Sequence, residues 1–311
     1  MAELRFDGRV VAITGAAQGM GREYALLLAE RGAKVLVNDI KGAADTVALI
    51  RERGGEALEN RDDVTDPAGT DAIVAAALGQ WGRLDAIINN AAVYGGALPD
   101  PETTGRILNV HLVATINLVR SAMPTFRAQK YGRILNVGSG SMFGLPGVGI
   151  YAAGKGGVFG FTRSLAKDLA TDAETDIKAN LILPAAFQPG MINVPEPVLQ
   201  NAIEHAFTPA NIAPIAALLV HEACPAQGEA IHVGGGRHAR IVLATTEGWQ
   251  SPDDTPTPEG ILEHWAEVTA NQDLRETVGS LADLLARRGL PTYSVMELWE
   301  WTRTGKAPAE R

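Results

Sequence analysis

The feature that most constrains this chain is the alternation of short apolar runs with amphipathic segments up to about residue 235. The runs are rich in Val, Ile and Leu, which favour strands, and lie at residues 10–13, 34–38, 56–60, 84–88, 133–137, 179–183 and 230–233. Helical patterns lie between them at 19–31, 43–54, 66–81, 102–129, 150–171 and 210–221. This order predicts an α/β fold, a doubly wound parallel sheet of seven strands with helices on both faces.

The turn after the first strand is rich in glycine. It reads Thr14-Gly15-Ala16-Ala17-Gln18-Gly19-Met20-Gly21 and leads into a helix. A helix N-terminus presents unpaired N–H groups that attract a pyrophosphate, and glycine lets the backbone come close to the ligand. We therefore predict dinucleotide contacts from Gly15, Gln18, Gly19, Met20 and Gly21. A plain strand-to-helix turn is the alternative for this stretch taken alone.

An acidic residue follows the second strand. Asp39 stands where a carboxylate can accept both hydroxyls of an adenosine ribose and repel a 2′-phosphate. It favours NAD over NADP, although Arg22 and Lys41 are near enough in sequence to weaken the preference. A solvated aspartate at a strand end is the alternative.

Polar and small residues follow the third and fourth strands. Asp63 and Val64 lie where a carboxylate can accept from the amino group of an adenine. Asn89-Asn90-Ala91-Ala92 combines asparagines that pin a loop with small residues that admit a flat ring. We predict cofactor contacts from Asp63, Val64, Asn90 and Ala91, and ordinary turn residues are the alternative.

The residues that carry chemistry follow the fifth strand. Ser139 lies at its end, with Ser141 as a fallback, and Tyr151 and Lys155 lie four residues apart on one face of the next helix. An ammonium beside a phenol stabilises the phenolate, so we expect Lys155 to lower the pKa of Tyr151 toward neutrality. Tyr151 is then a general acid/base for a carbinol or carbonyl oxygen that Ser139 also holds.

Together these residues resemble the short-chain dehydrogenase/reductase family over roughly residues 6–236. The matching positions, in the family's order, are Thr14-Gly15-x-x-x-Gly19-x-Gly21, Asp63-Val64, Asn89-Asn90-Ala91, Ser139 and Tyr151-x-x-x-Lys155. The resemblance implies a Rossmann-type fold, a nicotinamide dinucleotide, and interconversion of a secondary alcohol and a ketone. It also implies that Tyr151 exchanges the proton, Lys155 binds the nicotinamide ribose, Pro184 lines the cofactor site, and the protein is a homodimer or homotetramer.

Other segments are similar to one branch of the family, the dehydrogenase part of peroxisomal multifunctional enzyme type 2 and related hydroxyacyl-CoA or hydroxysteroid dehydrogenases. They are Val37-Asn38-Asp39-Ile40, Lys130-Tyr131-Gly132-Arg133 and, in the tail, Thr257-Pro258-Glu259 with Trp265. The segment 185–208 covers the substrate in the family and is apolar here, which favours an apolar substrate. Packing of this segment on the tail is the alternative.

Several positions depart from the family pattern. His111 stands where the catalytic asparagine is expected, and its imidazole either supports a proton path to the lysine or merely packs. Ser139 lies one residue closer to the tyrosine than usual. Alanine replaces glycine at Ala92 and Ala185, and Pro189 replaces the threonine that binds the carboxamide, so we expect weaker cofactor affinity than in typical members.

Composition argues against several other classes of function. A net charge of −9 disfavours binding to nucleic acid. The single cysteine leaves no internal disulfide and no cysteine-rich metal site, and it suits a reducing cytoplasm. No apolar stretch is long enough to cross a membrane, and no signal-peptide core begins the chain. We expect a cytoplasmic enzyme without a metal that acts on a small molecule.

Residues 237–311 exceed the family's usual length. We expect them to form a helical extension, packed on a catalytic domain at 1–236 or on a neighbouring subunit. A short strand at 242–244 and a linker at 251–258 precede helical patterns at 259–271, 273–289 and 293–303. The tail also holds four tryptophans, which favour core or subunit contacts: Trp249, Trp265, Trp299 and Trp301.

Three functions remain in competition. The leading one is an NAD-dependent dehydrogenase acting on a secondary hydroxyl of an apolar substrate, of the hydroxyacyl-CoA or hydroxysteroid class. The second is an NADPH-dependent ketone reductase, against which Asp39 argues. The third is a catalytically silent dinucleotide-binding sensor or scaffold, for which the departures leave room and against which the retained Ser139, Tyr151 and Lys155 argue.

Overall fold

The computed structural model describes residues 3–187, 195–252, 255–272, 274–276 and 301. The chain divides into two compact units, Met1–Ile241 and Val242–Arg311. The first unit contains every helix and strand expected of the catalytic domain. The division falls after the last strand of the main sheet rather than at residue 236.

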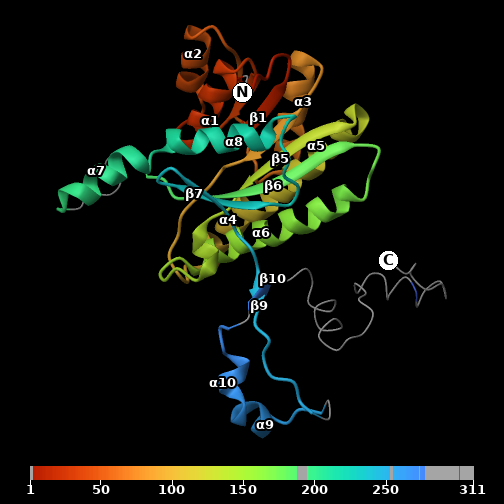
Figure 1. Cartoon of the computed structure of the whole chain (residues 1–311). Coiled ribbons are helices and arrows are strands. Elements are labelled where there is room, and N and C mark those ends of the chain that lie inside the picture. The colour runs from red at the N-terminus through yellow and green to blue at the C-terminus, as the bar shows by residue number, and fades with distance from the viewer. Residues whose placement is uncertain (1–2, 188–194, 253–254, 273, 277–300, 302–311) are drawn as a thin grey trace. The chain divides into compact units, whose positions relative to one another are not determined.

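The first unit is built on one sheet with the strand order β3-β2-β1-β4-β5-β6-β7-β8 (Figure 1). The strands are β1 (Val10–Thr14), β2 (Lys34–Asn38), β3 (Glu56–Asn60), β4 (Ala86–Asn89), β5 (Tyr131–Val137), β6 (Asp176–Pro184), β7 (Ala230–Gly234) and β8 (Arg237–Arg240). All neighbours pair in parallel except β7 and β8. The predicted doubly wound parallel sheet is thereby confirmed.

The eighth strand is a correction to the seven that the sequence predicts. β8 pairs antiparallel with β7, and Gly234 lies opposite Arg237. Gly235 and Gly236, between them, have positive φ of 57° and 75°. Two residues with positive φ form the tight turn that best matches the twist of a hairpin, so this glycine pair returns the chain onto the sheet.

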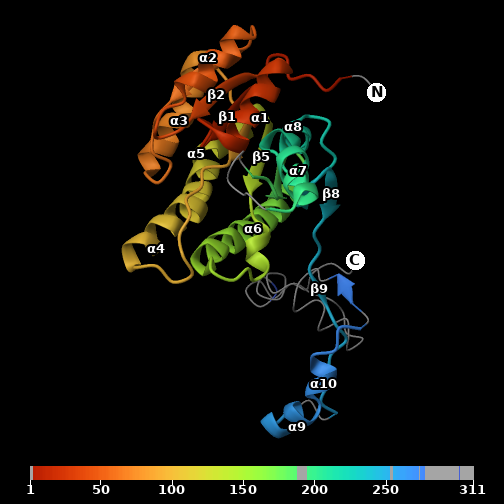
Figure 2. The same ribbon diagram turned by 90° about the vertical axis from the view of Figure 1, so that its left-hand side faces the viewer.

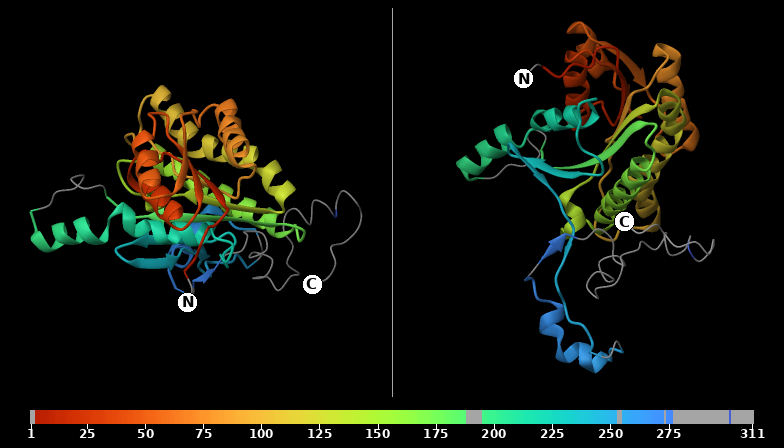
Figure 3. Two further views of the ribbon diagram at one scale, coloured as in Figure 1. Left: turned by 90° about the horizontal axis from the view of Figure 1, so that it is seen from above. Right: turned by 45° about the vertical axis from the view of Figure 1, so that its right-hand side comes forward.

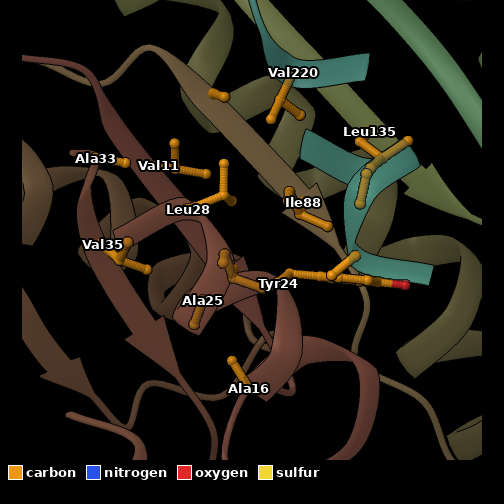
Figure 4. Packing of buried hydrophobic residues seen from close by; sticks show 14 of the residues in the cluster. Val11, Ala16, Tyr24, Ala25, Leu28, Ala33, Val35, Ile88, Leu135 and Val220 are labelled. Atoms are coloured by element: carbon orange, nitrogen blue, oxygen red, sulfur yellow. The ribbon is translucent and has the colours of Figure 1, made fainter. Parts of the chain in front are cut away.

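Helices cover both faces of the sheet (Figure 2). On one face lie α1 (Gly19–Glu30), α2 (Ala44–Glu52) and α8 (Ala213–Val220), the last preceded by the short helix η3 (Pro209–Ile212). On the other lie α3 (Pro67–Trp81), α5 (Ala114–Gln129) and α6 (Gly149–Ala170). Along β1 the side chains alternate: Val11 and Ile13 join the first core, and Val10 and Ala12 the second. Figure 4 shows α1 packed on the first face, with Tyr24 and Leu28 over Val11 and Ile88.

The register of the sheet brings polar residues together where the strands end. Thr14 pairs with Asn38, and Asn38 pairs with Asn60. Asn89 pairs with Asn136 on the other side of β1. The strand order reverses between β1 and β4, and a crevice at such a switch point is where sheets of this kind bind ligands.

The single helix predicted for 102–129 is wrong in its middle. The structure has α4 (Pro101–Leu108), a π-helical turn η1 (Asn109–Val113) and then α5. A π turn closes hydrogen bonds one residue further along than an α turn, so it accommodates one extra residue while the helix keeps its direction. The turn contains His111.

Two further helices complete the first unit. A 3₁₀ turn, η2 (Gly140–Phe143), follows β5, and α7 (Pro197–Ala206) follows β6. α7 is a helix that the sequence does not predict; it has no buried residue and projects from the rest of its unit (Figure 3). Among the described residues no single helix is long and apolar enough for a membrane span. The bent pair Pro197–Ala206 and Pro209–Val220, at 54°, passes that test of length and composition when taken together.

The second unit is described only in part. β9 (Ala244–Thr245) pairs antiparallel with β10 (Arg275–Glu276), and α9 (Pro258–Glu263) and α10 (Trp265–Val268) lie between them. Trp249 stacks on His264 with ring centroids 4.5 Å apart. The prediction of a helix at 273–289 is wrong for residues 275–276, which form the strand β10. Trp299 and most of the last two predicted helices lie outside the described residues.

Candidate active site

The glycine turn after β1 adopts a backbone that only glycine accommodates freely. Gly15 and Gly19 have φ of 63° and 58°. A Cβ on Gly15 would lie 2.8 Å from Cα of Ala91, and one on Gly21 would lie 2.5 Å from the carbonyl oxygen of Gly15. These glycines therefore permit a turn that wraps closely against the end of β4.

Hydrogen bonds join this turn to the loop after β4. The Asn90 side-chain amide donates to the carbonyl oxygens of Thr14 and Gly15, at 2.9 and 3.0 Å. The backbone N–H groups of Asn90 and Ala91 donate to the Thr14 hydroxyl, at 3.0 and 3.1 Å. These hydrogen bonds thus hold the loop after β1 and the loop after β4 together on either side of the switch point.

The N-terminus of α1 fits a dinucleotide pyrophosphate. Gln18 is the N-cap residue in an extended conformation, its side chain makes no capping bond, and the first turn carries no acidic residue. The first N–H groups of α1 and the positive end of its dipole therefore face outward from Gly19, Met20 and Gly21. The residues present fit the group that the sequence predicts.

Two carboxylates lie where the sequence predicts the adenosine end of the cofactor. Asp39 accepts from the backbone N–H groups of Ala17 and Lys41, at 3.2 and 3.0 Å, which holds its charge beside the glycine turn. Asp63 accepts from both the N–H and the hydroxyl of Thr65, at 2.8 Å each, while Val64 packs against the second core.

A buried amide pair, Asn38 and Asn60, lies beneath these carboxylates and was not predicted from the sequence. The side-chain amide of Asn38 donates to Asn60 Oδ1 at 2.6 Å and to the Asp62 carbonyl at 2.9 Å. Only the fold shows that β2 and β3 end side by side, so this contact has no signature in the linear chain. It ties together the two strand ends that carry Asp39 and Asp63.

Ser139, Tyr151 and Lys155 come together at the end of β5. The Ser139 hydroxyl accepts from the Ser141 N–H at 3.2 Å. The Lys155 ammonium is 3% exposed, donates to the Val137 carbonyl at 2.6 Å, and lies 5.7 Å from the centre of the Tyr151 ring. Ser141 is buried, and its hydroxyl has no partner among the described residues.

The pKa values of Tyr151 and Lys155 differ from the sequence-based expectation. Burial, followed by the nearby Tyr94, raises the pKa of Tyr151 to about 12, against which the Ser139 bond acts. Burial lowers the pKa of Lys155 to about 7. The lysine does not bring the tyrosine toward neutrality because its ammonium is directed at the backbone of β5 and is itself desolvated.

His111 lies against the same tyrosine. Its ring meets the Tyr151 ring edge-on, with centroids 4.9 Å apart, and it is 1% exposed. Burial, and then the charge of Lys155, lower its pKa to about 4, so the imidazole is neutral. Nε2 lies 2.7 Å from the carbonyl oxygen and 3.2 Å from the N–H of Val93, and Nδ1 has no partner among the described residues.

Tyr94 is a site residue that sequence reasoning missed. It lies in the loop after β4 and stacks on Tyr151 with centroids 5.3 Å apart and 17° between the planes. A lone aromatic in a loop has no periodic pattern. The available signal was its place, two residues after the Asn-Asn-Ala-Ala segment that follows a strand.

The remaining predicted positions are placed as follows. Pro184 ends β6 and pairs with Val233, and Ala185 follows it. Ala92 has negative φ, since Lys130 is the one described non-glycine residue with positive φ. Pro189 lies outside the described residues. In the part of the chain that the structure describes, no three His, Cys, Asp or Glu residues gather as a metal site.

Comparison with known proteins agrees with this geometry. The family model described as short chain dehydrogenase matches residues 9–196. The chain therefore belongs to the short-chain dehydrogenase family, which confirms the enzyme class predicted from the sequence, an NAD(P)-dependent dehydrogenase or reductase.

Some of its relatives are longer enzymes, and the chain matches only a part of each. The chain is 34% identical over 305 residues to mouse peroxisomal multifunctional enzyme type 2, covering 91% of this chain and 40% of that one. The structure of the full-length enzyme of that name from Drosophila melanogaster is similar with a TM-score of 0.75 and 30% identity, over 91% of this chain and 49% of that one. The chain thus spans less than half of these relatives. A short chain dehydrogenase from Mycobacterium avium is similar almost end to end, with a TM-score of 0.74, 26% identity, and coverage of 85% of this chain and 97% of that one.

Proposed function

We propose that this protein oxidises a secondary hydroxyl group of an apolar small molecule to a ketone, with NAD as the hydride acceptor. One observation carries the proposal: the Ser139 and Tyr151 side chains lie beside a buried lysine, at the sheet edge that also carries the glycine turn. A hydroxyl pair of this kind can hold one substrate oxygen and move its proton.

Each residue has a defined task in this proposal. Ser139 hydrogen-bonds the substrate oxygen, and Tyr151 accepts the proton from it. Lys155, whose ammonium lies 5.7 Å from the ring centre, is the residue that would hold the nicotinamide ribose. His111 is neutral and supports the loop over the tyrosine through Val93, and its unpartnered Nδ1 is the atom through which a proton path to Lys155 would run.

The preference for NAD and for an apolar substrate rests on separate features. Asp39 holds a carboxylate beside the glycine turn, where it disfavours a 2′-phosphate. The helix that follows the sixth strand exposes Val198 and Leu199, at 77% and 49%. The similarity to multifunctional enzyme type 2 favours the hydroxyacyl-CoA class among apolar substrates.

The proposal is tested by following NADH formation from 3-hydroxyacyl-CoA esters and from 2-octanol. We expect NAD to be preferred over NADP at least tenfold, and Tyr151→Phe to lose about 100-fold or more in rate. Tyr131→Phe, at the opposite end of β5, is the matched control and keeps the rate. Turnover that survives in Tyr151→Phe would refute the assignment, and NAD binding without any turnover would favour the silent sensor.

We also propose a homodimer or homotetramer, formed as in the family through α6 and α8. The surface of the neighbouring η1 and α5 supports it, because Val113 and Ile116 are apolar and exposed at 40% and 37%. Sedimentation analysis at micromolar concentration checks the proposal, and a monomer contradicts it. A cytoplasmic setting stays a prediction.

A further inference from the structure

The turn that carries Asp39 is closed on itself by hydrogen bonds. The Asp39 carboxylate accepts from the N–H of Lys41 at 3.0 Å, and the Asp39 carbonyl oxygen accepts from the N–H of Gly42 at 2.8 Å. Gly42 has a φ of 89°, a conformation that glycine adopts without strain. The N–H of Asp39 donates to the carbonyl oxygen of Asn60 at 3.0 Å. The next residue after Asn60, Arg61, therefore begins beside this turn.

The side chain of Arg61 covers the end of the turn. A Cβ on Gly42 would lie 2.7 Å from both Cζ and Nη2 of Arg61, so the guanidinium lies directly on the glycine backbone. The Arg61 side chain is 62% exposed and carries a permanent positive charge. A positive charge beside a ribose site favours a 2′-phosphate, whereas the Asp39 carboxylate disfavours it. The two side chains therefore oppose each other in the choice between NADP and NAD.

Glu59 pairs with this guanidinium. Glu59 Oε1 accepts from Arg61 Nε at 2.8 Å and from the N–H of Ala43 at 2.9 Å. The Glu59 side chain is only 28% exposed, and among the described residues it is the one acidic partner of Arg61. One carboxylate oxygen thus neutralises the charge of Arg61 and fixes the backbone that follows the turn.

We propose that Glu59 is a specificity-determining residue for the dinucleotide: it neutralises Arg61 and so leaves Asp39 to reject the 2′-phosphate of NADP. This inference rests on the proposed function for the preference for NAD. Glu59 acts through Arg61 and the turn, so it is a positioning residue rather than a ligand of the cofactor.

The substitution Glu59→Gln separates the charge of Glu59 from its hydrogen bonds. A glutamine side chain keeps an oxygen that accepts from Ala43, so the backbone of the turn is retained, but it no longer neutralises the guanidinium. We expect the dissociation constant for NADP, measured by titration calorimetry on the full chain, to fall about fivefold relative to that for NAD, as for one exposed charge pair. The gain should shrink at high salt, because salt screens exposed charges. An unchanged ratio of the two constants overturns the proposal.

The matched control is Glu56→Gln. Glu56 lies on the same strand, β3, at its other end, and pairs with Lys34 at 3.2 Å. The same chemical change there should leave the ratio of the two dissociation constants unaltered. Glu59→Gln combined with Arg61→Gln removes the released charge, so the ratio should return to that of the parent protein. A gain in NADP binding that survives in the double variant would mean that the effect does not pass through Arg61, and overturns the proposal.

The binding experiment separates this inference from the proposed function. A parent protein that binds NADP more tightly than NAD refutes the NAD preference of the proposed function, and the change of the ratio in Glu59→Gln still decides the role of Glu59. A parent protein that prefers NAD, with the same ratio in Glu59→Gln, overturns this inference alone. Failure to oxidise any alcohol counts against the proposed function only, because dinucleotide binding is measured in the absence of substrate.

Discussion

Tyr24 carries a polar atom that the fold leaves unsatisfied. The residue is fully buried between α1 and the sheet, and its hydroxyl has no hydrogen-bond partner among the described residues (Figure 4). Burial raises the pKa of Tyr24 above its usual value, so the group stays protonated. A buried hydroxyl without a partner costs free energy that an isosteric ring without the oxygen does not.

We therefore expect Tyr24→Phe to stabilise the protein. The free energy of unfolding should rise by about 1 kcal/mol, the lower end of the penalty for a buried unpaired polar group. Urea denaturation followed by circular dichroism measures it. Tyr94→Phe is the control, since its residue is exposed and the same chemical change there should leave stability unaltered. A loss of stability in Tyr24→Phe would show that the hydroxyl has a partner after all.

His111 couples the stability of the protein to pH. Its pKa falls from 6.5 to about 4 on folding, so between these values the unfolded chain binds the proton and the folded one does not. Stability from this residue is present above pH 6.5 and is lost as the pH falls toward 4. At pH 5 the loss relative to pH 7 is about 2 kcal/mol.

The prediction compares how much the free energy of unfolding of the parent protein and of His111→Asn falls between pH 7 and pH 5. His111→Asn should lose about 2 kcal/mol less than the parent protein when urea unfolding is repeated at pH 5 after pH 7. Groups that are common to both proteins cancel in the comparison. Equal losses would mean that the histidine is protonated, or solvated, in the folded state.

Elements of the sheet are joined at their starting ends by one arginine. Arg133 is fully buried on β5, and its guanidinium donates to the carbonyl oxygen and carboxylate of Asp176, at 2.6 Å each, where β6 begins. It donates at 3.2 Å to the carbonyl oxygens of His221 and Glu222, which follow α8. It also lies 4.4 Å from the centre of the Tyr131 ring. One side chain thus links β5, β6 and the end of α8.

A lysine cannot replace this fork of donors. Arg133→Lys keeps the charge but leaves buried carbonyl groups unpaired, so we expect a loss of about 3–5 kcal/mol in the free energy of unfolding. Arg61→Lys, whose side chain is 62% exposed and pairs with Glu59, should lose less than about 1 kcal/mol. Similar losses in the two variants would contradict the role assigned to Arg133.

What the sequence could predict also differs between elements. The strands were predictable because short Val-, Ile- and Leu-rich runs alternate with helical patterns. The grouping of Tyr151 with Lys155 was predictable from their spacing of four residues on one helix, and that of Ser139 with them from the family resemblance. The π turn at η1 and the strand β8 were not predictable. The first adds only one residue to an otherwise continuous helical pattern, and the second reads Arg-His-Ala-Arg, which has no apolar face. The raised pKa of Tyr151 could not be predicted because it results from burial, and the residues next to Tyr151 in the sequence do not show how deeply it is buried.

At the scale of the whole molecule, the first unit has a complete core of its own. Among the described residues, the three clusters of buried apolar side chains lie within residues 6–241, as do the residues of the candidate site. A unit with its own core is expected to fold alone.

A chain ended after Ile241 should therefore remain folded and keep its cofactor. We expect cooperative thermal unfolding, and a dissociation constant for NAD within about threefold of that of the full chain, measured by titration calorimetry. The full chain is the reference in both experiments. An insoluble product, or loss of NAD binding, would show that the second unit completes the first.

The π-helical turn has a consequence for how this protein can change over generations. Deleting one codon within 109–113 would let α4 and α5 run on as one regular helix, with tighter hydrogen bonding than the turn allows. It would also remove the extra residue that the π turn accommodates, so that His111 would no longer face Val93 and Tyr151 as it does now. A lineage selected for stability alone would accept that deletion, and a lineage selected for turnover would not.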